Sequence, residues 1–228
     1  MPTTQAERRK IFQFLRQIRA NNNRPWFHNH RALYDEARDI FLRMIGELIN
    51  EISTFDEQII GLEPKRTTYR IHRDTRFSAD KSPYKIHLGS FINTHGTKAF
   101  TLGYYLHLQP DECMLACGNY WMPPEALTAI RNDIVANAEP LLSILHDRHF
   151  KSVYGASEIG TDCLKTVPKG FPKDFPHPEL IRPRAYCLTL PLSDNDVLAP
   201  TWLNHIAQAC RAAKPFMDYF NATLEDYI

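Results

Sequence analysis

Three short apolar runs, each separated from the next by a cluster of turn residues, most constrain the fold of this 228-residue chain. Ile86–Ile92, Ala99–Leu108 and Cys113–Asn119 have the length and composition of β-strands. The intervening Asn93–Thr97 and Gln109–Glu112 contain Asn, Gly, Pro and Asp, which favour turns. Because parallel neighbours need crossovers of a dozen or more residues, connections this short predict an antiparallel meander.

Helical patterns precede these strands. Thr4 and Glu7 have the spacing of a capping box, and apolar residues then recur at the period of one buried helical stripe (Ile11, Phe14, Leu15 and Ile18). A second stripe predicts a longer helix over Asn29–Ser53. The two helices together predict an N-terminal hairpin that packs on the sheet.

The second half of the chain predicts more helix and one more strand. Pro123 has the position of a helix start, Ala185–Leu190 reads as a strand, and Asn195–Tyr227 predicts helix that is kinked or restarted near Pro215. We therefore expect an α+β fold with a central antiparallel sheet of about four to six strands, packed by the N-terminal hairpin and C-terminal helices. No repeat or linker divides the sequence, which favours a single domain over residues 1–228.

Composition excludes several classes of protein. The hydrophobic share of 43% is that of a globular protein, and no apolar run approaches the roughly 18 residues that cross a bilayer. The N-terminus has no signal-peptide pattern, and the five cysteines form no C-x-x-C pair. We expect a soluble cytoplasmic protein with no membrane partner, metal or cofactor.

Positive charge is concentrated in one segment. The whole chain carries +1, whereas residues 65–85 contain seven basic and two acidic residues, a local net charge of +5. Tyr69–Thr75 reads as a strand, Arg76–Pro83 as a loop, and the next strand begins near Tyr84. The segment is therefore predicted to be a strand–loop–strand element between sheet neighbours.

Arginine density makes this element a candidate anion site, because a guanidinium offers a planar fork of donors that suits phosphate or carboxylate. The expected anion donors are Arg70, Arg73, Arg76, Lys81 and Lys85. Organising or stacking roles are expected for Asp74, Asp80, Phe77, Tyr84 and Trp121. The alternative is that the arginines and aspartates only tie the loop to its own fold.

Other chemistry has weaker support in the sequence. His72 and Asp74, with His87 on the next strand, have the types of a metal or acid–base group, but the basic surroundings favour ordinary hydrogen-bonded histidines. No G-x-S-x-G, P-loop or G-x-G-x-x-G motif occurs. No catalytic residue is assigned.

Three functions fit these observations. The leading hypothesis is binding of a phosphorylated small molecule or nucleotide, with or without catalysis. The second is a nucleic-acid-binding module that uses the same basic residues and aromatic rings. The third is an interaction module that docks an acidic protein partner.

The order of residues 70–85, Arg-x-x-Arg-Asp-Thr-Arg-Phe-Ser-x-Asp-Lys-Ser-Pro-Tyr-Lys, resembles the signature of an uncharacterised family, domain of unknown function family 2461. Four further elements resemble that family: Asn22–Phe27, Gly103–Leu106, Gly118–Pro123 and Lys165–Phe171. The resemblance spans almost the whole chain and implies one domain. It implies no activity, cofactor or catalytic residue.

Overall fold

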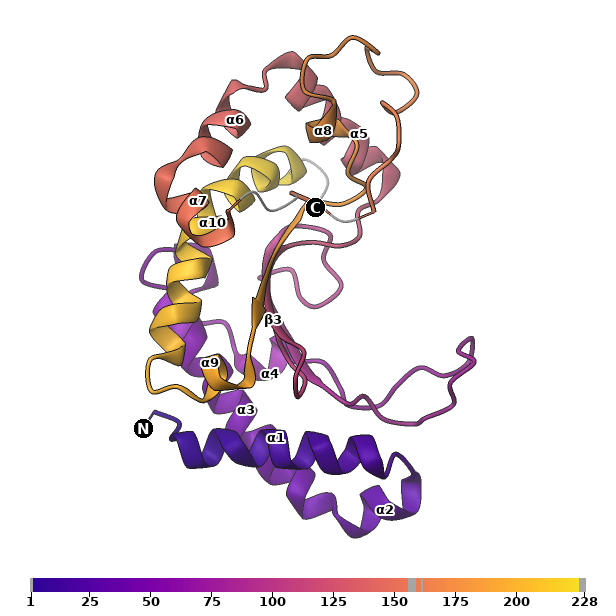
Figure 1. Ribbon diagram of the computed structural model, residues 1–228, viewed down its shortest axis with the longest axis vertical. Coiled ribbons are helices and arrows are strands. Elements are labelled where there is room, and N and C mark those ends of the chain that lie inside the picture. Colours follow the sequence, from indigo (N-terminus) through magenta and orange to yellow (C-terminus); the bar gives the residue numbers. More distant parts are fainter. Residues whose placement is uncertain (1, 156–158, 161, 226–228) are drawn as a thin grey trace. The chain divides into compact units, whose positions relative to one another are not determined.

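The computed structural model describes residues 2–155, 159–160 and 162–225 of the chain (Figure 1). Two compact units divide the chain: residues 1–97, 105–115 and 191–207 form unit 1, and residues 98–104, 116–190 and 208–228 form unit 2. The single domain over 1–228 stays a prediction.

The predicted antiparallel sheet is confirmed. It has four strands, β1 (Leu88–Ile92), β2 (Gly103–Leu108), β3 (Cys113–Gly118) and β4 (Cys187–Leu192), in the order β1-β2-β3-β4. Every strand thus pairs with its neighbour in sequence, which is the arrangement that the short turns predict. The long connection between β3 and β4 carries four helices: α5 (Pro124–Ala136), α6 (Glu139–His146), α7 (Arg148–Tyr154) and α8 (Pro178–Ile181).

The N-terminal hairpin is confirmed as well, and it belongs to unit 1. α1 (Gln5–Ala20) and α3 (Arg31–Ile52) pack against each other, with the short α2 (Arg24–Asn29) between them in sequence. Thr4 and Glu7 form the predicted capping box, which satisfies free amides at the start of α1. The apolar stripe of α1 is buried, as its period requires.

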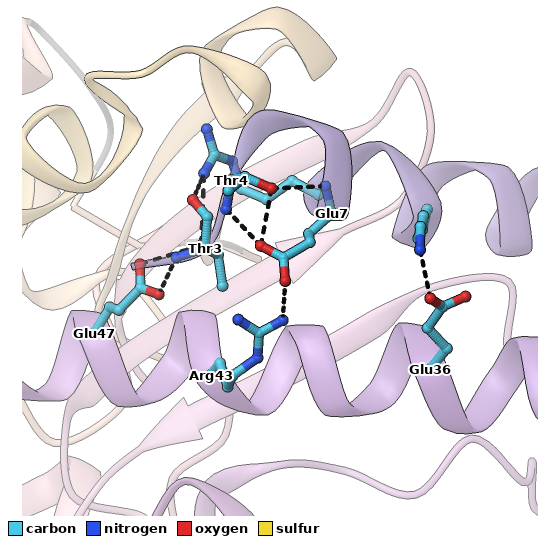
Figure 2. Close-up of polar contacts among 8 residues, drawn as sticks. Thr3, Thr4, Glu7, Glu36, Arg43 and Glu47 are labelled. Atoms are coloured by element: carbon cyan, nitrogen blue, oxygen red, sulfur yellow. Dashed lines mark hydrogen bonds and ion pairs between the residues drawn. The ribbon is translucent and has the colours of Figure 1, made fainter. Parts of the chain in front are cut away.

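Polar contacts add to this packing along one side of the hairpin (Figure 2). Both carboxylate oxygens of Glu47 on α3 accept hydrogen bonds from Thr3, whose backbone N–H lies 2.6 Å from Oε1. Arg43 donates to Glu7 at 2.5 Å. Hydrogen bonds from Thr4 and Arg43 lower the pKa of Glu7 to about 2, so its carboxylate stays charged in all but strong acid.

Short helices and one long helix complete the chain. Their bounds are η1 (Glu57–Ile59), α4 (Pro64–Thr67), α9 (Asp194–Leu198) and α10 (Trp202–Leu224). A restart near Pro215 is wrong, because α10 continues through Pro215, and a kink there stays a prediction. The break lies earlier, at residues 199–201, where α9 has ended and α10 has not begun. The predicted helix end at Tyr227 lies outside the described residues.

A buried guanidinium joins distant parts of unit 1. Arg8 is 2% exposed, and its Nε donates to the carbonyl oxygen of Val197 at 2.9 Å. Its other nitrogens donate to the carbonyl oxygens of Thr3, Leu198 and Ala199. This one side chain therefore fixes the start of α1 against the end of α9.

We expect Arg8→Met to lower the free energy of unfolding by about 3 kcal/mol, because it leaves several buried carbonyl oxygens without donors. Urea denaturation measures this loss. The matched control is Arg9→Met, which removes the exposed neighbouring guanidinium on α1 and should change stability by less than about 0.5 kcal/mol. Equal losses in the two variants would contradict the structural role of Arg8.

Candidate functional site

The basic segment belongs wholly to unit 1 and forms an arm, residues 69–87, that leads into β1. In Figure 1 the arm is the long loop that extends away from the sheet. Backbone hydrogen bonds hold its base, from Tyr69 N to Gly89 O at 3.0 Å and from Lys85 N to Ile71 O at 2.8 Å. A third bond joins Arg73 N to Pro83 O at 3.0 Å.

The prediction of a strand over Tyr69–Thr75 is wrong. The segment makes only isolated antiparallel bridges, Thr68 with Ser90 and His72 with Tyr84. The physical reason is Pro83, which lies opposite Arg73. Proline has no backbone N–H to donate, so a continuous ladder of hydrogen bonds cannot form at this position. The loop predicted over Arg76–Pro83 is confirmed, since these residues form neither helix nor strand.

In the outer part of the arm, the basic side chains bind carboxylates or a carbonyl oxygen of the arm itself. Asp74 accepts two hydrogen bonds from Arg76, at 3.0 and 2.6 Å, and these lower the pKa of Asp74 to about 2. Arg73 pairs with Asp80, whose pKa falls through hydrogen bonds from Ser82 and from Arg73. Lys81 donates to the carbonyl oxygen of Thr75 at 2.9 Å. Three of the five predicted anion donors are thus engaged within the arm.

The three predicted stacking residues lie in different surroundings. Phe77 is 96% exposed at the outer end of the arm, with the Arg76 guanidinium carbon 5.8 Å from its ring centroid. Tyr84 is buried and stacks on Phe27 with ring centroids 4.1 Å apart. Trp121 belongs to unit 2. Within unit 1, the exposed Phe77 and the buried Tyr84 therefore do not form a common stacking surface.

Arg70 and Lys85, at the base of the arm, are the two remaining predicted donors. Lys85 is half-buried, and its Nζ lies 5.1 Å from the ring centroid of Tyr69. Burial lowers the pKa of Lys85, and repulsion from Arg70 lowers it further. Within the described part of the chain, no carboxylate forms an ion pair with either residue. Asp74, whose charge Arg70 also stabilises, is already held by Arg76.

Two imidazoles lie near Lys85, and one of them also lies near Arg73. The rings of His87 and His107 have centroids 4.3 Å apart, and the hydroxyl of Tyr105 lies 2.9 Å from Nδ1 of His107. Burial lowers the pKa of both histidines, that of His87 to about 4, with further repulsion on His87 from His107 and Lys85. Both rings are therefore neutral at pH 7, and each can donate one hydrogen bond and accept another.

The positions in sequence explain why these side chains meet. Tyr105 and His107 alternate along β2 and so face the same side of the sheet, and Lys85 and His87 lie in the irregular segment directly before the neighbouring strand β1. We call this group the imidazole site. It consists of Tyr69, Arg70, Lys85, His87, Tyr105 and His107.

A glycine makes room for the tyrosine of the imidazole site. A Cβ atom at Gly89 on β1 would lie 2.6 Å from the hydroxyl oxygen of Tyr105, which is closer than real Cβ atoms come to any neighbour. The hydroxyl can reach His107 only because position 89 has no side chain.

Sequence reasoning found part of this group and missed the rest. It grouped His87 with His72 and Asp74, but His72 contacts Phe27 and Tyr84, with ring centroids 6.1 and 5.2 Å away. Over the described residues, no three His, Cys, Asp or Glu side chains are placed to hold a metal ion. The signal for His107 and Tyr105 was their alternation on a predicted strand next to that of His87.

The antiparallel sheet, helical hairpin and long β3–β4 connection define an α+β fold. One protein family matches the sequence of this chain. The chain matches that family over residues 10–219, and its description reads "Conserved hypothetical protein (DUF2461)". The chain belongs to this family, which confirms the resemblance of the arm motif. No curated protein and no solved structure matches the chain. Among the helices of the described residues, none is long and apolar enough to span a membrane.

We expect Gly89→Ala to lower the free energy of unfolding by about 1 to 3 kcal/mol, because the new methyl group displaces the Tyr105 hydroxyl from His107. Urea denaturation gives the loss, and NMR of the His107 ring reports the broken hydrogen bond. The double variant Gly89→Ala with Tyr105→Phe lacks the clashing oxygen and should recover part of the stability. A double variant no more stable than Gly89→Ala would contradict this account.

Proposed function

We propose that the imidazole site binds the anionic group of a phosphorylated small molecule or nucleotide. One observation carries the proposal: Arg70 and Lys85 lie near each other without an ion-pair partner among the described residues, whereas Arg73 and Arg76 have aspartates. The exposed Arg70 guanidinium and the half-buried Lys85 ammonium repel each other, which lowers the pKa of Lys85. A bound phosphate would remove that repulsion.

The chemistry of the neighbouring groups fits an anion with several acceptor atoms. The Arg70 guanidinium is a planar fork of donors, and the Lys85 ammonium is a compact charge on a flexible stem. The His107 ring already has Tyr105 at Nδ1 and a hydrogen bond with the Gln109 side chain, so the neutral His87 ring is the imidazole that can donate to a ligand. The site can thus combine two charged donors with one imidazole donor.

Binding of inorganic phosphate, sugar phosphates or nucleotides should raise the melting temperature, because a ligand that binds only the folded state stabilises it by mass action. We expect Arg70→Gln and Lys85→Met to weaken binding at least tenfold. The matched control is Arg76→Gln, which removes the same charge from a residue already paired with Asp74. An equal loss in the control would show only a general effect of net charge and would refute the site.

The same ligand should change the ionisation of His87. The depressed pKa of about 4 reflects burial and nearby cations, so stability contributed by the neutral ring is lost as the pH falls from about 6.5 towards 4. A bound anion offsets the cations and should raise the pKa of His87, measured by NMR titration of the imidazole protons. An unchanged pKa at saturating phosphate would place the anion elsewhere.

A second candidate function rests on Phe77. A phenylalanine that is 96% exposed beside Arg76 is an unusual surface group, and it suits stacking on a base of single-stranded nucleic acid. Binding of single-stranded DNA or RNA should then weaken steeply with salt and weaken further in Phe77→Ser. Binding that is absent, or unaffected by Phe77→Ser, would exclude this function and leave the small-molecule proposal standing.

A further inference from the structure

Unit 2 contains a hollow beside α5 that no part of the proposed function uses. Its volume is about 410 Å³, which lies in the range of small-molecule pockets. Aromatic, apolar and charged side chains line it, mostly cationic among the charged ones: Tyr120, Trp121, Leu127, Arg131, Asp162 and Arg184 are examples. All of these residues belong to unit 2.

A fixed turn presents the aromatic wall of this hollow. Trp121 is 57% exposed and Tyr120 is 80% exposed, although both directly follow buried residues at the end of β3. The buried Asn119 accepts a hydrogen bond from the Trp121 N–H at 3.0 Å and donates to the carbonyl oxygens of Ala99 and Thr101. The indole is therefore held towards solvent by a buried amide.

The backbone of Gly118 reinforces the same turn. Its φ angle is +145°, and a Cβ there would lie 2.4 Å from the carbonyl oxygen of Tyr186. Only glycine allows this close approach. The exposed position of Trp121 thus follows from the local fold and not from a loose surface loop.

The cationic wall contains a buried guanidinium whose hydrogen bonds are incomplete. Arg131 on α5 is 8% exposed, and its Nη2 donates to the carbonyl oxygen of Pro183 at 2.8 Å. Its Nε has no hydrogen-bond partner among the described residues. Burial lowers the pKa of Arg131, a hydrogen bond with the Tyr186 side chain opposes this, and the neighbouring Arg184 lowers the pKa further.

Negative charge around Arg131 is sparse. No carboxylate in the described part of the chain forms an ion pair with it, and Arg184 has a 3.6 Å contact with the exposed Asp162. Burying a charged group costs free energy where some of its N–H groups lose water without gaining an acceptor. Nε itself is shielded, whereas another part of the Arg131 side chain lines the hollow and can meet an acidic group there.

We infer that this hollow is a binding site for a flat aromatic ring that carries one carboxylate or phosphate group. The ring stacks on Trp121 against the apolar side chains of Leu127 and Leu164. The acidic group binds the guanidinium of Arg131, with Arg184 at the rim as a second cation. A neutral ring would leave the Arg131 donor unsatisfied, and an aliphatic acid would leave the exposed indole without a stacking partner.

Titration with three probes tests this inference. The probes are 2-naphthoate, its uncharged match 2-naphthamide, and adenosine monophosphate as the phosphate source. We expect 2-naphthoate or adenosine monophosphate to bind and to quench the exposed Trp121, with 2-naphthamide at least tenfold weaker by isothermal titration calorimetry. Failure of both acids to bind at millimolar concentration, or equal affinity for 2-naphthamide, would overturn the inference.

Variants assign the binding to this hollow. Trp121→Ala and Arg184→Gln should each weaken binding of the acidic probe at least tenfold, and both positions are exposed enough for the fold to tolerate the change. Arg131→Lys keeps the charge but loses the fork and should also weaken binding. The matched control is Arg148→Gln, an exposed arginine of the same unit, which should bind normally. Loss in the control, or none in Trp121→Ala and Arg184→Gln, would refute the site.

The experiment is independent of the imidazole site. Arg70→Gln in unit 1 should leave the affinity for 2-naphthoate unchanged, since Arg70 is not among the residues of the hollow. Loss of 2-naphthoate binding in Arg70→Gln would show that the probe reports the other site and would overturn this inference.

Discussion

The guanidinium of Arg8 binds carbonyl oxygens near both ends of unit 1, at Thr3 and at residues 197–199. A buried charge is costly unless its donors are satisfied, and here four carbonyl oxygens satisfy them. The contact holds α1 in place, α1 packs on α3, and α3 contacts β1. The strand that follows the imidazole site is therefore supported, through two helices, by one arginine.

Arg8 is an arginine whose hydrogen bonds serve the fold. The other basic residues can be compared with it by the partners that each one has. Arg73 and Arg76 resemble it, because neighbouring aspartates satisfy them within the arm. Lys85 and Arg131 differ, since each has lost water to burial without gaining a carboxylate among the described residues. The number of basic residues in a segment is thus a poorer guide to a binding site than the partners that each one lacks.

Local sequence patterns predicted much of the fold and only part of the site. The capping box at Thr4 and the meander depend on residues close in sequence, so their spacing was sufficient. The His87–His107 pair depends on the register between β1 and β2, and a shift of one residue would turn His107 to the other face. The pairing of Arg73 with Asp80 depends on the path of an irregular loop, which hydrophobic periodicity does not describe.

The base of the arm and its outer end are held by different contacts, and this difference determines where residues could be inserted. Its base is fixed by backbone bonds at Tyr69, Arg73 and Lys85, whereas its outer ion pairs join residues only two or seven positions apart. Residues inserted next to Phe77 would lengthen the exposed end and leave the base in register. The arm therefore offers a natural position for an added reporter peptide, one that leaves the sheet and its imidazoles undisturbed.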